Sequence, residues 1–296
     1  MTMSNSASSN VNVNVSVNVA AIIGLPVAQS LSPAMHNAVF HHRDCGWTYI
    51  AMEVQKNAVE DVLRTLGGKN IQAFSVTMPH KEAVYTLLGA VDSDLGEVDE
   101  SGVSARSVNT ISVRDGRLIG SNTDGDGCCN ALEQAGVQIG GVRAVVMGAG
   151  GTARAIVAAL GRRGAIDIAV INRTEAHALD AVSCAKAARV GSVDDIARAN
   201  VVINATSVGM GDAQTPIEAI HLHANLVVLD CVYYPLETTL LREAKIAGAS
   251  TVDGLWMLVH QGALQQLAWL GEVGDIQIMR QAALDELSHR VVLHNA

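Results

Sequence analysis

From residue 20 onward, hydrophobic positions alternate between short continuous runs and longer stretches in which they recur every three or four residues. The short runs predict strands, and the longer stretches predict helices. The predicted strands cover residues 20–24, 47–54 and 71–77, and the predicted helices cover residues 32–43 and 57–68. Ser32 is expected to be the N-cap of the first helix, with Pro33 at its first helical position, and Gly67 is expected to close the second helix. This alternation predicts a parallel sheet with helices on both faces.

The pattern changes between residues 107 and 125, where two strand-like runs flank Asp115 and Gly116. An Asp-Gly pair between such runs is a strong hairpin signal, so we expect an antiparallel ribbon within a mainly parallel sheet. A helical stretch follows, and residues 142–164 begin a second series of strand–helix units. We therefore predict an α/β chain of two lobes with a boundary near Asp124.

The two ends of the chain have different patterns. Residues 255–271 and 278–292 again have helical periodicity, which alone does not indicate the lobe against which they pack. The first 18 residues form a low-complexity alternation of Asn and Val, which favours a leader outside the fold over an additional strand.

Composition excludes several classes of protein. The 296 residues include 20 basic and 29 acidic side chains, a net charge of −9, and 49% are hydrophobic, which indicates a soluble acidic protein rather than a disordered chain. No apolar run reaches the length of a membrane span, and no block of Lys and Arg is present. We therefore expect neither a membrane nor a nucleic acid as a partner.

The cysteines and the N-terminus bear on the compartment. The five cysteines are scattered, odd in number and without a CxxC pair, so we expect reduced, packed thiols and no metal site. The N-terminus lacks the basic and apolar regions of a secretory signal, which makes the cytoplasm the expected location.

The strongest single motif is a glycine-rich loop at residues 148–154, between an apolar predicted strand and a long apolar helix. Gly148 permits a tight turn, Gly150 lets the backbone approach a pyrophosphate, and the N-terminus of the helix supplies free N–H groups. Ala153 stands where a third glycine often serves helix-to-strand packing. The motif predicts a dinucleotide site, with a purely structural turn as the alternative.

The end of the next predicted strand, Asn172-Arg173-Thr174, bears on which dinucleotide binds. NAD sites usually have an acidic residue here for the ribose 2′-hydroxyl, whereas an arginine favours the 2′-phosphate of NADP. Arg173 therefore favours NADP. The alternative is an ordinary surface arginine at the end of a strand.

Two further residues occupy positions suited to proton transfer. Lys81 follows a buried predicted strand, at the edge where parallel sheets bind ligands. Asp124 lies at the predicted lobe boundary, where two-domain enzymes form their clefts. A partly buried lysine can exchange a proton with a substrate. Taken singly, Lys81 is more often a solvated loop residue, and Asp124 a turn former before Gly125.

Together and in this order, these segments resemble the shikimate dehydrogenase family from about Ala21 to about Gly271. The resemblance rests on motifs whose order along the chain few other families would reproduce. The motifs are Gly24-Leu25-Pro26, Ser30-Leu31-Ser32-Pro33, His36-Asn37, Val76-Thr77-Met78-Pro79-His80-Lys81, Ser107-Val108-Asn109-Thr110, Asn122-Thr123-Asp124-Gly125, residues 148–154, Asn172-Arg173-Thr174, residues 204–210, residues 230–235 and residues 253–261.

The resemblance implies an NADP-dependent oxidoreductase that reversibly reduces 3-dehydroshikimate to shikimate, in the chorismate pathway toward aromatic amino acids. It implies that Lys81 and Asp124 form the catalytic pair. The implied substrate contacts are Ser30, Ser32, Ser75, Thr77, Asn109, Tyr233 and Gln261. The implied cofactor contacts are Gly148, Ala149, Gly150, Gly151, Thr152, Ala153, Asn172, Arg173, Thr174, Thr206, Ser207, Val208, Gly209, Gly254 and Met257.

The resemblance also implies a domain division, because Gln261 must reach the same substrate as Lys81. The final helices then return to the first lobe. Residues 19–124 and 255–296 form the expected substrate-binding domain, and residues 125–254 form the expected Rossmann domain. The expected partner is a small-molecule substrate, and a homodimer is one assembly consistent with the sequence.

Three positions depart from the usual family pattern. Ser75 replaces a common asparagine, Trp256 replaces a frequent glycine beside Met257, and His177 replaces a second basic residue near the cofactor phosphate.

Two alternative functions stand beside shikimate dehydrogenase. One is a quinate or quinate/shikimate dehydrogenase that also uses NAD, although Ser32, where a quinate enzyme more often has threonine, favours shikimate. The other is a non-catalytic nucleotide-sensing relative.

Overall fold

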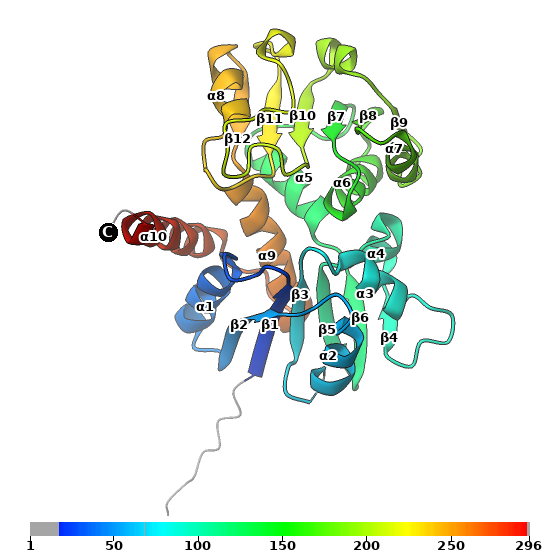
Figure 1. Ribbon diagram of the computed structural model, residues 1–296, viewed down its shortest axis with the longest axis vertical. Coiled ribbons are helices and arrows are strands. Elements are labelled where there is room, and N and C mark those ends of the chain that lie inside the picture. Colours follow the sequence, from blue (N-terminus) through cyan, green and yellow to red (C-terminus); the bar gives the residue numbers. More distant parts are fainter. Residues whose placement is uncertain (1–17, 68, 295–296) are drawn as a thin grey trace, which may run out of the picture.

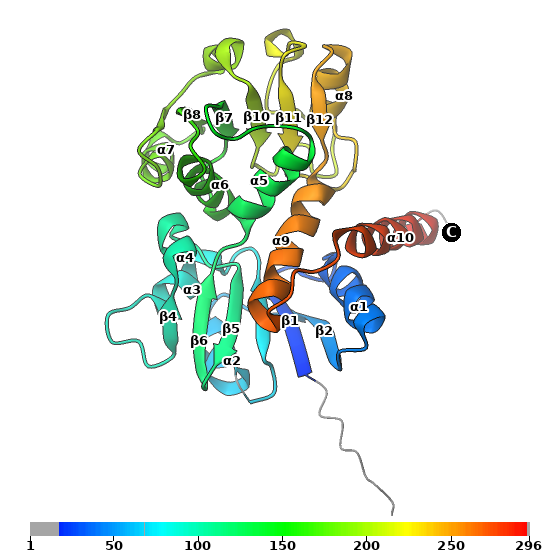
Figure 2. The same cartoon turned by 180° about the vertical axis from the view of Figure 1, so that it is seen from behind.

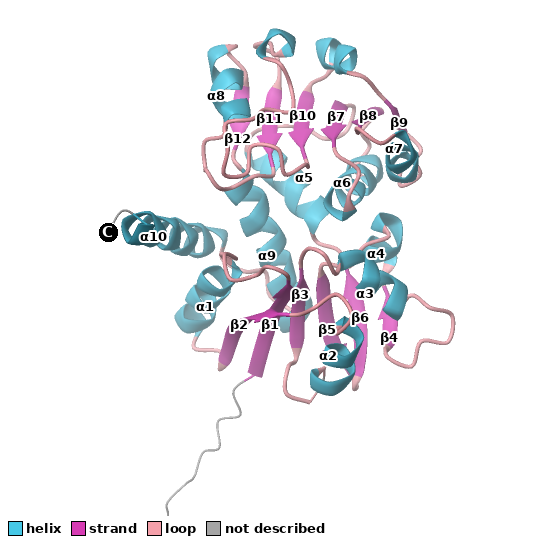
Figure 3. Ribbon diagram, in the orientation of Figure 1, coloured by secondary structure: helices cyan, strands magenta, loops and turns pink. Residues whose placement is uncertain are grey.

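Two separate six-stranded sheets, each covered by helices, form the two lobes of the molecule (Figure 1). The computed structural model describes residues 18–67 and 69–294. The first strand begins at Asn18, so the rest of the predicted leader lies outside the described residues. In Figure 3, helices flank the sheet of each lobe, which confirms the predicted α/β class.

The first lobe contains a mixed sheet with the strand order β2-β1-β3-β5-β6-β4. Its elements are β1 (Asn18–Gly24), α1 (Ser32–Arg43), β2 (Trp47–Glu53), α2 (Val59–Leu66), β3 (Ala73–Val76), α3 (Lys81–Leu88), β4 (Gly96–Val98), α4 (Glu100–Ala105), β5 (Thr110–Arg114) and β6 (Arg117–Ser121). Only β5 runs antiparallel to its neighbours, β3 and β6. The β5–β6 turn contains Asp115 and Gly116, with φ of 50° and 76°, so the predicted hairpin is confirmed.

The start of α1 differs from the predicted capping. The helix begins at Ser32 itself, and Leu31, the residue before it, provides no side-chain cap. The Ser32 N–H donates instead to Oγ of Ser30, 3.2 Å away. The prediction of Ser32 as N-cap is therefore wrong, and Pro33 is the second residue of the helix rather than the first, still within its first turn.

The second lobe contains a fully parallel sheet with the order β12-β11-β10-β7-β8-β9. Its elements are α5 (Asp124–Gln134), β7 (Arg143–Met147), α6 (Gly151–Arg162), β8 (Asp167–Ile171), α7 (Glu175–Val182), β9 (Ala188–Val190), β10 (Val201–Asn204), β11 (Val227–Asp230), α8 (Thr239–Ile246) and β12 (Ser250–Val252), with short 3₁₀ helices at Val193–Arg198 and Ala219–His221. This order is that of a Rossmann fold, and the strand order reverses between β7 and β10. Two apolar clusters cover the two faces of the sheet.

The last two helices are α9 (Gly254–Leu270) and α10 (Ile276–His294). Helix α9 begins in the second lobe, where Trp256 and Met257 join the apolar cluster, and α10 packs on the first lobe. Figures 1 and 2 both show α9 running from the second lobe to the first beside α5, with α10 next to α1. Near its end, Trp269 donates from Nε1 to the carbonyl of Ile111 in β5, 3.1 Å away. Met279 and Ala283 of α10 join the apolar cluster around Leu31. Periodicity did not indicate the lobe against which these helices pack; α9 contacts both lobes, and α10 packs on α1 of the first lobe and on α9.

None of the helices in the described part of the chain is long and apolar enough to cross a membrane. The described residues likewise contain no group of three or more His, Cys, Asp or Glu side chains that could hold a metal ion.

Candidate active site

An ion pair between Lys81 and Asp124 lies where the two lobes meet. Lys81 is the first residue of α3, and Asp124 is the first residue of α5. Nζ of Lys81 lies 2.5 Å from Oδ2 of Asp124, and the two side chains are 16% and 7% exposed. A carboxylate at a helix N-terminus interacts favourably with the helix dipole, and it also offsets the cost of burying an ammonium group. The fold therefore places in contact the two residues, Lys81 and Asp124, that the sequence analysis identified separately.

Thr152 joins this pair from the second lobe. Its Oγ1 lies 3.2 Å from Nζ of Lys81 and 3.2 Å from Oδ2 of Asp124. The side chain of a residue in the glycine-rich loop thus contacts both members of this ion pair. The sequence interpretation assigned Thr152 only to the cofactor and did not find this contact.

Asn109 fixes the other oxygen of Asp124. Its Nδ2 donates to Oδ1 of Asp124 at 2.7 Å and to Oγ1 of Thr123 at 3.0 Å, and it lies 3.4 Å from Oε1 of Gln261. Asn109 and Gln261 are 2% and 7% exposed. Gln261, from α9, therefore lies beside Asn109 and within the same buried network as Asp124.

Tyr49 of β2 and Ser75 of β3 form a second polar group. The Tyr49 hydroxyl donates to Oγ of Ser75 at 2.6 Å, and Ser75 donates to Oε1 of Gln265 at 2.9 Å. Burial raises the pKa of Tyr49, and hydrogen bonding with Ser75 and Ser32 opposes that rise. The Ser75 side chain, which is shorter than the asparagine common in the family, is therefore hydrogen-bonded to the Tyr49 hydroxyl. Tyr49 was not identified from the sequence.

The motif His36-Asn37 holds Tyr49 in place. The Asn37 side chain accepts from the Tyr49 N–H at 2.7 Å and donates to its carbonyl at 2.9 Å. The His36 ring stacks on the Tyr49 ring, with centroids 4.4 Å apart and an interplanar angle of 11°. Burial lowers the pKa of His36 to about 3, so the ring is neutral at pH 7. Both residues thus act on the position of one tyrosine.

Gln265 connects the two polar groups. Its Nε2 donates to the Asn109 carbonyl at 3.2 Å and to Oγ1 of Thr110 at 3.1 Å, while its Oε1 accepts from Ser75. Gln261 and Gln265 are four residues apart on α9 and therefore share one face of the helix. That spacing was the sequence signal that could have identified Gln265.

The remaining predicted substrate residues are Ser30, Ser32, Thr77 and Tyr233. Ser30 and Ser32 lie at the start of α1, and Thr77 follows β3. Arg290 of α10 donates to the Ser30 carbonyl at 3.2 Å. Tyr233 packs against the apolar cluster of α1 and α9, and burial raises its pKa.

The glycine-rich loop connects β7 to α6 at the point where the strand order reverses. Gly148 has a φ of 107°, which strongly favours glycine, and Gly150 is the N-cap of α6. A side chain added at Gly150 would meet no atom within 4 Å, so there is room for a phosphate group against the free N–H groups of the helix. Ala153 is fully buried, as close helix-to-strand packing requires. These residues fit a dinucleotide.

Asn172, Arg173 and Thr174 follow β8, the strand next to β7. The Asn172 side chain donates to the Thr174 carbonyl at 2.9 Å. Arg173 is exposed, and no described side chain forms an ion pair with it. Its guanidinium is therefore available to a phosphate group.

The segment after β10 is held by side-chain bonds to its own backbone. Oδ1 of Asn204 accepts from the N–H and the hydroxyl of Thr206, and Nδ2 of Asn204 donates to the carbonyl of Val208 at 3.1 Å and to Oδ1 of Asp230 at 2.9 Å. Burial raises the pKa of Asp230. Together with Ser207 and Gly209, this turn borders the same end of the sheet as the glycine-rich loop.

Gly254 and Met257 begin α9 close to the end of β11. Met257 is 5% exposed, and its Sδ lies 3.3 Å from Sγ of Cys231. The bulk of Trp256 is accommodated by Arg280 of α10, whose guanidinium lies 4.1 Å above the indole ring.

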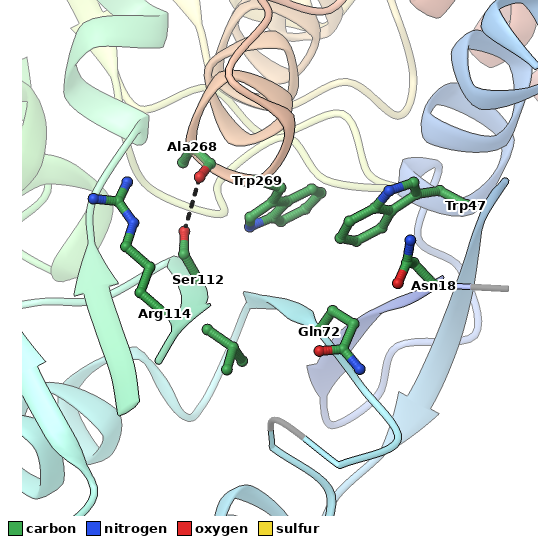
Figure 4. Close-up of a pocket in the computed structure, with 8 residues that line it drawn as sticks. Asn18, Trp47, Gln72, Ser112, Arg114, Ala268 and Trp269 are labelled. Carbon is green, nitrogen blue, oxygen red and sulfur yellow. Dashed lines mark hydrogen bonds between the residues drawn. The ribbon is translucent and has the colours of Figure 1, made fainter. Parts of the chain in front are cut away.

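Two hollows lie elsewhere on the molecule. One, of about 260 Å³, lies at the far end of the first lobe between Trp47, Trp269, Gln72 and Arg114 (Figure 4). The other, of about 360 Å³, is lined by residues of the α5–β7 connection and by Asn200. Neither contains any residue of the Lys81–Asp124 site.

A Rossmann lobe joined to a second α/β lobe, with a lysine–carboxylate pair where they meet, defines a dinucleotide-dependent oxidoreductase. Family models agree: one for the shikimate dehydrogenase substrate binding domain matches residues 22–111, and one for shikimate / quinate 5-dehydrogenase matches residues 130–215. The chain belongs to the shikimate dehydrogenase family.

Individual relatives support the same assignment. The chain is 42% identical over 271 residues to a shikimate dehydrogenase (NADP(+)) from Thermococcus kodakarensis, covering 90% of this chain and 96% of the relative. It resembles the structure of shikimate 5-dehydrogenase from Thermus thermophilus in complex with NADP(H) and shikimate, with a TM-score of 0.83, 33% identity and coverage of 90% and 99%. It also resembles ligand-free 5-ketofructose reductase of a Gluconobacter strain, with a TM-score of 0.80, 31% identity and coverage of 90% and 98%.

Proposed function

We propose that this chain catalyses the reversible NADP-dependent reduction of 3-dehydroshikimate to shikimate, with Lys81 and Asp124 as its catalytic pair. The observation that carries the proposal is the buried Lys81–Asp124 ion pair. This pair contacts Thr152 of the glycine-rich loop and the buried Asn109 side chain. The family membership of the chain supports the same reaction.

Lys81 supplies the proton that the reaction requires. Reduction of a ketone adds a hydride to carbon and a proton to oxygen, and NADPH supplies the hydride when it is bound. The Lys81 ammonium donates from Nζ to the carbonyl oxygen, and in the oxidation direction the neutral amine takes the proton back. Asp124 accepts from Nζ through Oδ2 and from Asn109 through Oδ1, so the ammonium is both oriented and electrostatically compensated.

The other polar residues orient a polyhydroxylated ring. Asn109 and Gln261 lie in the polar network of Asp124 and, with Thr77, would bond ring hydroxyls, whereas Ser30 and Ser32 would bond the carboxylate. Tyr49 and Ser75 provide hydroxyls between these two ends. In this proposal, residues 19–124 with 255–296 bind the substrate, and residues 125–254 bind NADP.

Cofactor preference follows from Arg173. Its exposed guanidinium would pair with the 2′-phosphate of NADP, which NAD lacks. The loop from Gly148 to Ala153 would hold the pyrophosphate, and the turn from Thr206 to Gly209 with Gly254 and Met257 would border the nicotinamide.

The test is a steady-state matrix of shikimate and quinate against NADP and NAD. The highest kcat/KM is expected for shikimate with NADP. A higher value for quinate would transfer the assignment to quinate dehydrogenase, and binding of NADP without turnover of either acid would indicate a nucleotide-sensing protein.

A further inference from the structure

The first turn of α6 contacts the first lobe as well as the glycine-rich loop from which it starts. A Cβ atom added at Gly151 would lie 2.5 Å from Oγ of Ser107, so a larger residue here would require the Ser107 side chain to move. Thr152 contacts Lys81 and Asp124. The two lobes therefore touch at the N-terminus of α6, beside the catalytic pair.

Arg154, in the same turn, extends across this junction. Its Nε donates to the carbonyl of Ala105 at 3.1 Å, and its Nη2 donates to the carbonyl of Arg106 at 3.3 Å and to Oε1 of Glu82 at 2.7 Å. Its Nη1 donates to the carbonyl of Ala149 at 3.3 Å. Arg154 is only 9% exposed.

These four contacts join α3, the end of α4 and the glycine-rich loop. Glu82 follows Lys81 in α3. The Lys81 carbonyl also accepts from the N–H of Val108, two residues beyond Arg106, at 3.0 Å, so the end of α4 is joined to the backbone of the catalytic lysine. Ala105 and Arg106 end α4, where carbonyl groups lack partners within the helix. Ala149 belongs to the glycine-rich loop. One guanidinium thus sets the position of α3 and α4 relative to the loop that would hold the pyrophosphate.

Charge alone does not explain this arrangement. Glu82 is 63% exposed, so its ion pair with Arg154 is screened by water and contributes little. The bonds to two α4 carbonyls need no counter-charge, but they do need donors pointing in several fixed directions. A guanidinium has this fork geometry and an ammonium does not.

We propose that Arg154 is a positioning residue, which fixes the Lys81 ammonium relative to the glycine-rich loop and so aligns proton transfer with hydride transfer. The inference rests on the proposed function. Misplacement of a reacting group by about 1 Å costs roughly 10²-fold in rate, so the effect should be measurable.

The test compares Arg154→Lys and Arg154→Ala with Arg189→Lys. Arg189 is a suitable control because its guanidinium also makes several bonds, to Asp167 and Asp195, but only within the second lobe. We expect kcat to fall roughly tenfold in Arg154→Lys and roughly 10²-fold in Arg154→Ala, with Kd for NADP within about threefold of wild type. Arg189→Lys should leave kcat unchanged.

Two further readouts separate positioning from simple loss of folded protein. With NADPH deuterated at the transferred position, the isotope effect on kcat should rise in the Arg154 variants because hydride transfer becomes slower, whereas a smaller folded fraction would leave it unchanged. Without any ligand, hydrogen exchange of residues 81–88 and 100–106 should be faster in Arg154→Lys than in Arg189→Lys.

An unchanged kcat, or a fall in kcat with an unchanged isotope effect, would overturn the proposal. A loss confined to NADP affinity would assign Arg154 to cofactor binding instead and would equally overturn it. A wild-type protein without activity on shikimate would remove the proposed function, but the exchange experiment would still show whether Arg154 joins the lobes.

Discussion

Acidification should destabilise the first lobe through His36. The ring is fully buried against Tyr49, Phe40 and Trp269, and burial lowers its pKa from 6.5 to about 3. In the unfolded chain the same histidine takes up a proton near pH 6.5. Between pH 6.5 and pH 3 the unfolded state therefore binds more protons than the folded state, and stability falls as the pH falls through that window.

The size of this effect follows from the two pKa values. A pH of 5 lies about 1.5 units below the unfolded-state pKa of 6.5 and above the folded-state pKa of about 3. Protonation of His36 therefore stabilises the unfolded state relative to the folded state by about 2 kcal/mol, at 1.36 kcal/mol per unit. At pH 7 the same contribution is only about 0.2 kcal/mol. The loss between pH 7 and pH 5 is therefore about 2 kcal/mol from one side chain.

Urea denaturation of wild type, His36→Gln and His41→Gln at pH 7 and pH 5 measures this contribution, with ionic strength held constant. Tryptophan fluorescence reports on the relevant lobe because Trp269 lies 5.2 Å from the His36 ring. His36→Gln should be less stable than wild type at pH 7, but it should lose about 2 kcal/mol less on acidification. His41 is exposed on the same helix and controls for the removal of a histidine. Equal losses in wild type and His36→Gln would refute the reasoning.

Three further outcomes are expected at the active site. Lys81→Ala should reduce kcat by roughly 10²–10⁴-fold with little change in Kd for NADP, and near-normal turnover would exclude Lys81 as the proton donor. Arg173→Asp should reduce kcat/KM for NADP by roughly one to two decades and spare NAD, whereas equal losses for both cofactors would indicate a structural arginine. Tyr49→Phe removes the hydroxyl that donates to Ser75 and should raise KM for shikimate by about fivefold to tenfold, while KM for NADP stays constant. An unchanged KM for shikimate would separate Tyr49 from the substrate.

The sequence predicted the parts of the fold that local rules determine. The Asp115-Gly116 hairpin follows from the positive φ values that its turn requires, and the Rossmann lobe follows from an apolar strand, a glycine-rich loop and an apolar helix. The start of α1 was predicted wrongly because Ser30, two residues earlier, provides the hydroxyl that bonds the Ser32 N–H.

The contacts that could not be predicted join residues far apart in the chain. Tyr49 and Ser75 lie 26 residues apart, and Ser75 and Gln265 lie 190 residues apart. Their partnership depends on the packing of α9 against the first lobe, which periodicity does not specify. Arg154 belongs to a recognised motif, but its partners at Glu82 and at the end of α4 depend on how the lobes meet.

The sequence around Asp124 explains why so many distant segments meet there. Asp124 begins α5, and this helix lies between α6 and α9. A Cβ at Gly125 would lie 2.1 Å from the Ala155 carbonyl oxygen of α6, and one at Gly127 would lie 2.7 Å from the backbone nitrogen of Gln261 in α9. Two glycines, one and three residues after Asp124, therefore let both neighbouring helices approach closely. That approach brings α6, which carries Thr152, and α9, which carries Gln261, to the same carboxylate, so the Asp-Gly-Asp-Gly segment supplies the geometry of the site as well as its charge.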